Sequence, residues 1–140
     1  MKSSVGKILL FLLLLSCSMV FTGCNEADTP IGYVNFTIEP NSTRYSNLNR
    51  VGGYEYFVGG YKGVVVFRYS LTEFLAYERA CPHDHETRVE VLEDSGVILQ
   101  CPECGSQFIY TDGSPIKGPS VFGLRQYSTY YDGRYLSVYN

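Results

Sequence analysis

The feature that most restricts the fold of this chain is a series of short apolar segments with a period of two, separated by turns that contain glycine or aspartate. In residues 34–38, Val34, Phe36 and Ile38 alternate with polar residues, which is the pattern of a half-buried strand. Asp132-Gly133 predicts the turn of a hairpin. Further strands are expected at residues 54–58, 63–68, 74–78, 97–100, 107–110, 127–131 and 135–139. No window has the pattern of a long amphipathic helix, so the sequence predicts an all-β sandwich or barrel.

The composition is that of a single globular domain. The 140 residues are 45% hydrophobic and 18% charged, which excludes a disordered or fibrous protein. The net charge of −3 argues against a nucleic-acid partner, because little in the chain would neutralise a run of phosphates.

Residues 1–23 have the features of a secretory signal peptide. Lys2 and Lys7 precede an apolar run at residues 8–15, which is shorter than the roughly 20 residues that a bilayer span needs. Residues 21–24, Phe-Thr-Gly-Cys, resemble a bacterial lipobox, which implies that Cys24 is lipidated and becomes the mature N-terminus. Cys17 is a second candidate for lipidation.

Lipidation at Cys24 would attach the mature protein to a membrane. We then expect residues 24–32 to form a flexible tether and residues 33–140 to form the folded domain. We expect the protein in the cell envelope of a Gram-negative bacterium, with the outer membrane as the expected anchor. Glu26 and Asp28, just after Cys24, resemble the surface-export signal of Bacteroidetes lipoproteins, which leaves exposure on the cell surface open.

The three remaining cysteines lie on two predicted loops. The first loop is residues 81–85, Cys-Pro-His-Asp-His, and the second is residues 101–106, Cys-Pro-Glu-Cys-Gly-Ser. An odd number of cysteines cannot pair off completely in disulfides. The 17 residues between His83 and Cys101 are enough for a hairpin that brings the loops face to face. Four thiolate or imidazole ligands, two from each loop, would suit a tetrahedral metal or a two-iron cluster.

The two loops resemble those of the Rieske family, whose pattern is Cys-x-His, a gap in the high teens, and then Cys-x-x-His. The residues that match are Cys81, His83, Cys101, Pro102, Gly105, Ser106 and Phe108. Gly118-Pro119 is similar to the family's loop that covers the cluster. The resemblance covers residues 33–140. It implies a Rieske-like all-β sandwich or barrel with a small cluster-binding subdomain near residues 79–119.

The chain departs from the family pattern at Cys104, which stands where the family has its second histidine. The resemblance implies a [2Fe-2S] cluster with Cys81 and Cys101 on one iron and His83 and Cys104 on the other. Three thiolates make the oxidised centre more negative than two. We therefore expect a reduction potential between those of two-histidine Rieske centres, about −150 to +300 mV, and plant-type four-cysteine centres, about −400 mV.

Other residues near the loops have roles that stay open. Glu86 and Glu103 hold the positions where quinol-oxidising Rieske proteins carry a disulfide between the loops, so the resemblance favours the ferredoxin type. His85 is a spare imidazole and an alternative to His83 as ligand. Tyr110 either hydrogen-bonds a ligand of the cluster or packs in the core.

Three functions are compatible with these residues. The favoured one is an electron carrier with an unidentified redox partner protein. The second is a structural or binding module on the same scaffold, with zinc, a disulfide or no metal at the site; it stays open because residues 1–7 lack the arginine pair with which exported Rieske proteins usually begin. A thiol oxidoreductase using Cys101 and Cys104 is disfavoured, because a redox Cys-x-x-Cys normally opens a helix and residues 105–110 predict a strand. The sequence therefore favours a protein that is not an enzyme.

Overall fold

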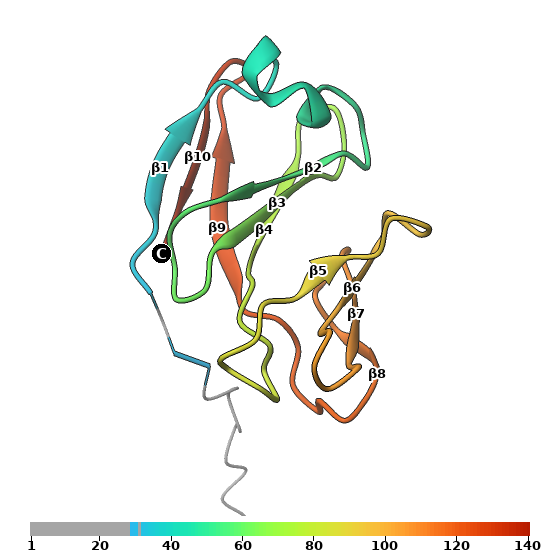
Figure 1. Ribbon diagram of the computed structural model, residues 1–140. Coiled ribbons are helices and arrows are strands. Elements are labelled where there is room, and N and C mark those ends of the chain that lie inside the picture. The colour runs from blue at the N-terminus through green and yellow to red at the C-terminus, as the bar shows by residue number, and fades with distance from the viewer. Residues whose placement is uncertain (1–28, 31) are drawn as a thin grey trace, which may run out of the picture.

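The computed structural model describes residues 29–30 and 32–140 (Figure 1). The predicted signal peptide, Cys24 and most of the predicted tether lie outside the described residues. The elements in chain order are β1 (Asn35–Ile38), a short 3-10 helix η1 (Thr43–Asn49), β2 (Tyr54–Phe57), β3 (Val64–Arg68), β4 (Phe74–Glu78), β5 (Glu90–Val91), β6 (Ile98–Gln100), β7 (Gln107–Ile109), β8 (Pro115–Lys117), β9 (Gln126–Tyr131) and β10 (Leu136–Tyr139). The prediction of an all-β chain is confirmed.

The larger sheet has six antiparallel strands in the order β1-β10-β9-β4-β3-β2. Its closing hairpin, β9–β10, turns at Asp132 and Gly133 as predicted. The Asp132 carboxylate accepts the backbone N–H groups of Arg134 and Tyr135, and Gly133 takes a positive φ of 100°. The apolar core of this sheet consists of Val34, Ile38, Leu48, Val64, Val66, Phe74, Ala76, Tyr127, Leu136 and Val138.

Strand β3 is buried on both of its faces, which explains why its sequence does not alternate. Val64 and Val66 point into the core of the large sheet, while Val65 and Phe67 point into a second apolar cluster on the opposite face. That second cluster joins the large sheet to the smaller one. Its buried members are Val65, Phe67, Tyr77, Cys81, Val89, Val91, Leu99, Cys101, Phe108 and Leu124.

The smaller sheet has four antiparallel strands in the order β5-β6-β7-β8 and lies beside one end of the larger sheet (Figure 1). It falls within the predicted cluster-binding subdomain, residues 79–119, whose independence as a folding unit stays a prediction. The segment from β4 to β5 carries the first predicted loop, and the turn from β6 to β7 carries the second. The packing of the two sheets therefore brings both loops to the same end of the molecule.

The sequence did not predict η1, β5 or β8. The two strands have two and three residues, too few for a period of two to be detected. The helix η1 buries only Leu48, so it has no apolar stripe in its sequence. In the part of the chain that the structure describes, no helix is long and apolar enough to cross a membrane.

Candidate metal centre

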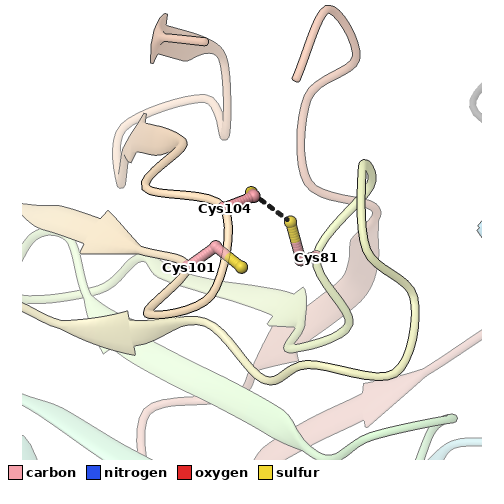
Figure 2. Close-up of side chains that lie close together, drawn as sticks. All are labelled: Cys81, Cys101 and Cys104. Atoms are coloured by element: carbon pink, nitrogen blue, oxygen red, sulfur yellow. Dashed lines mark hydrogen bonds between the residues drawn. The ribbon is translucent and has the colours of Figure 1, made fainter. Parts of the chain in front are cut away.

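Two turns bring three cysteine side chains together. Cys81 lies in the segment after β4, Cys101 directly follows β6, and Cys104 lies in the turn before β7. Their sulfur atoms all lie within 4.8 Å of one another. The Sγ atoms of Cys81 and Cys104 are 3.6 Å apart, and the Cys81 side chain faces the other two across the gap between the turns (Figure 2). All three are free thiols.

The second turn, residues 101–106, is closed by hydrogen bonds between its own backbone groups. The N–H of Gly105 donates to the carbonyl of Cys101 at 2.9 Å, and the N–H of Cys101 donates to the carbonyl of Ser106 at 2.9 Å. Gly105 takes a φ of +74°, which a residue with a Cβ atom rarely adopts. This tight closure directs the Cys101 and Cys104 side chains toward the same centre.

The first turn is closed by Asp84 and Thr87. The Asp84 carboxylate accepts the Thr87 hydroxyl at 2.6 Å and the Glu86 N–H at 3.2 Å. The N–H of Cys81 then donates to the Thr87 carbonyl at 2.9 Å. Cys81 is therefore the first residue of a loop that is closed by hydrogen bonds between its own residues.

The two histidines lie outside the group of sulfurs. Among the described residues, the ligand atoms within 4.8 Å of one another come from the three cysteines alone. His83 is exposed and, with His85 and Pro119, lines a surface hollow of about 260 Å³. The Nε2 atom of His85 lies 3.1 Å from the carbonyl oxygen of Pro82. The structure thus assembles three members of the predicted ligand set, and the fourth ligand stays a prediction.

The environments of the thiols differ. Burial raises the pKa of Cys81 to about 12. Burial also acts to raise the pKa of Cys104, but hydrogen bonds with Ser106, Cys101 and Cys81 outweigh it and bring that pKa below its ordinary value of 9.0. Cys104 therefore loses its proton more readily than Cys81, and a metal must displace the proton of each thiol that it binds.

Ser106 matches the Rieske pattern in sequence, but the sequence assigned no role to its hydroxyl. It is fully buried, and its hydroxyl oxygen accepts the Cys104 thiol at 3.1 Å and the Ser120 N–H at 2.9 Å. Its place two residues after Cys104 was the available signal, but only the fold reveals the bond to Ser120. Through this bond, the segment that follows Gly118 and Pro119 is attached to the second turn.

Tyr110 lies in the apolar cluster between the two sheets. Its ring packs against Phe67 at a centroid distance of 5.0 Å and against Tyr69 at 6.2 Å. The structure thus gives this residue a packing contact, and a hydrogen bond to a cluster ligand stays a prediction.

The donors fit a thiophilic metal group. Thiolates bind iron and zinc strongly, and imidazole suits both metals. Zinc and two-iron clusters take four protein ligands, so three sulfurs from two facing turns need one further donor. His83 and His85 lie on the same loop as Cys81, and either could supply it.

The family assignment comes from comparison with known proteins. The model of the Rieske [2Fe-2S] domain matches residues 44–128, a span that contains both turns and all three cysteines. The chain belongs to the Rieske family. The all-β Rieske-like fold expected from the two loops is thereby confirmed. No match was found among curated proteins.

Several solved Rieske-type structures are similar to this Rieske chain. The plasma membrane Rieske protein PetC3 from Synechocystis PCC 6803 is 25% identical, with a TM-score of 0.49 over 56% of this chain and 77% of that one. The ferredoxin of carbazole 1,9a-dioxygenase from Nocardioides aromaticivorans IC177 is 21% identical, with a TM-score of 0.48 over 64% and 86%. A chain of the complex of reduced oxygenase and oxidized ferredoxin in carbazole 1,9a-dioxygenase is 22% identical, with a TM-score of 0.46 over 64% and 82%.

The hydrogen bond between Ser106 and Cys104 predicts a pH-dependent reactivity. Because this bond helps to lower the pKa of Cys104, Ser106→Ala should raise that pKa and leave less thiolate at a fixed pH. We expect metal-free Ser106→Ala to be alkylated by iodoacetamide at Cys104 more slowly at pH 8 than the wild type, and at an equal rate at high pH. Peptide mass spectrometry measures the rate, and Ser128→Ala, a change on the exposed part of β9, is the control. Equal rates at pH 8 would contradict the assigned role.

Proposed function

We propose that this Rieske-family chain is a one-electron carrier that binds a [2Fe-2S] cluster through Cys81, His83, Cys101 and Cys104. The observation that carries the proposal is the convergence of three free thiols from two turns within a matched Rieske [2Fe-2S] domain. When bound, such a cluster takes up and releases one electron. The protein supplies the ligands, their orientation and the polarity of the surroundings.

The burial of the ligands suits a carrier. Cys81 and Cys101 are fully buried against the apolar cluster between the sheets, while Cys104 is partly exposed and His83 is exposed. One side of the centre is thus shielded from water, and the other lies close to the surface. A redox partner protein that docks on the exposed side would approach the cluster closely.

A role as a thiol oxidoreductase has less support. Cys101 is fully buried, and the turn that carries Cys104 leads into strand β7. A redox Cys-x-x-Cys normally opens a helix whose N-terminus lowers the thiol pKa, whereas a strand follows this one. We therefore propose that the protein transfers electrons without catalysing a reaction of its own.

We also propose that lipidation of Cys24 anchors the mature domain to a membrane of the cell envelope, with the outer membrane as the expected one. The lipobox-like residues 21–24 support this. Metabolic labelling with palmitate tests the anchor. We expect incorporation into the wild type and none into Cys24→Ser, whereas labelling of Cys17 in that variant would contradict the assignment.

The cluster itself is tested by composition. Protein isolated from its native host should contain two iron atoms and two acid-labile sulfides per chain, absorb visible light, and give a rhombic EPR signal after reduction. Cys101→Ala should lose most of the iron, because it removes a buried ligand. A colourless protein with one zinc per chain would contradict the proposal and favour the alternative of a degenerate Rieske scaffold.

The ligand role of Cys104 is tested by its exchange for the residue of the family pattern. Cys104→His replaces a thiolate with a neutral imidazole, so each oxidation state carries one negative charge fewer. We expect the reduction potential to rise toward the two-histidine range of about −150 to +300 mV. Protein-film voltammetry measures the shift, with Glu103→Gln as a control for the loss of one nearby charge. A potential that rises no more than in this control would contradict the ligand assignment.

A further inference from the structure

A short turn between β2 and β3 contacts the loop that carries Cys81 and His83. Tyr61 and Lys62, which we call the strap, both bind Glu86 of that loop. The Tyr61 hydroxyl donates to one Glu86 carboxylate oxygen at 2.7 Å, and the Lys62 ammonium pairs with the other at 2.6 Å. The strap thus binds the first ligand loop from outside the centre.

The backbone of the strap is fixed from within by Glu78, the last residue of β4. The side chain of Glu78 is fully buried, and its carboxylate accepts the N–H groups of Tyr61 at 2.6 Å, Lys62 at 2.9 Å and Ala80 at 3.0 Å. The Tyr127 hydroxyl donates a fourth hydrogen bond at 2.6 Å. A carboxylate removed from water requires such a set of donors, so the strap and β4 are tied into one rigid support.

Gly60 makes this close approach possible. Its φ is +65°, and a Cβ atom at this position would collide with the carboxylate of Glu78 and the hydroxyl of Tyr127. The strap therefore begins at a residue that can pass directly over the buried carboxylate.

The hydrogen bonds inside the first loop close it on itself but do not tie it to the strap. Asp84, Thr87 and the N–H of Cys81 bond only to partners within the loop. Glu86 is 74% exposed at its side chain and points toward the strap. Burial of Cys81 and the hydrogen bond from the Arg79 N–H to the Gly63 carbonyl still hold the base of the loop. Loss of the Glu86 carboxylate would therefore loosen the outer part of the loop, around His83, against the strap.

We propose that Glu86 is a positioning residue of the metal centre. Through the strap it holds the loop of Cys81 and His83 in the place where these ligands face Cys101 and Cys104. The expected effect of Glu86 on iron retention rests on the proposed cluster. The hold on the loop itself is independent of any metal, so the two parts can be tested separately.

The test compares Glu86→Ala with Glu103→Ala. Glu103 is exposed in the second loop beside Cys104, so the control removes the same charge close to the centre without touching the strap. One readout is hydrogen exchange of peptides covering residues 81–88 in the metal-free protein. The other is the rate at which a ferrous chelator removes iron from the holoprotein.

We expect both rates to increase about two- to fivefold in Glu86→Ala and to stay at the wild-type level in Glu103→Ala, because an exposed ion pair contributes only weakly to stability. Lys62→Ala should give a smaller increase and should add little in the double variant with Glu86→Ala, since both changes break the same contact. High salt should raise the wild-type rates toward those of Glu86→Ala, because it screens the pair.

Two results would count against these inferences in different ways. Equal hydrogen exchange and equal iron release in Glu86→Ala and Glu103→Ala would overturn the positioning role. A wild-type protein without iron would overturn the proposed cluster, and hydrogen exchange would then decide alone whether the strap holds the loop.

Discussion

The packing of the small sheet against the outer face of β3 and β4 determines where the functional side chains lie. Val65 and Phe67 project from β3 into this interface, where they meet Leu99 and Phe108 of the small sheet. The two cysteine turns leave the strands at the edge of the same interface, and Cys81 and Cys101 belong to its apolar cluster. The candidate metal centre is therefore an extension of the hydrophobic core, so the arrangement of its cysteines depends on the same burial that stabilises the fold.

Much of the fold could be predicted because the longer strands have clear patterns. β1 (Asn35–Ile38) and the β9–β10 hairpin follow from alternation and, in the hairpin, from the Asp132-Gly133 turn. The elements that could not be predicted owe their form to tertiary contacts. β5 is a strand only because Glu90 and Val91 pair with Gln100 and Leu99 of β6, and nothing local in two residues indicates such pairing.

In the candidate site, the cysteines could be predicted from the sequence, but most of the contacts around them could not. The resemblance of the two loops to the Rieske pattern predicted that Cys81, Cys101 and Cys104 belong together, and the hairpin-length segment between the loops left room for them to meet. The contacts around them join residues far apart in sequence, such as Ser120 with Ser106 and Lys62 with Glu86, and no periodicity signals them. The imidazole ligand could not be predicted with certainty from spacing, because the first loop carries two histidines, His83 and His85. The spacing of residues does not determine which of the two side chains points toward the sulfurs.

The unequal burial of the three sulfurs has a consequence for how the protein is loaded. Cys81 and Cys101 are inaccessible once the small sheet has packed, whereas Cys104 still reaches solvent. For the cluster proposed above, the side of Cys104 is the one by which iron could approach the sulfurs of the folded domain.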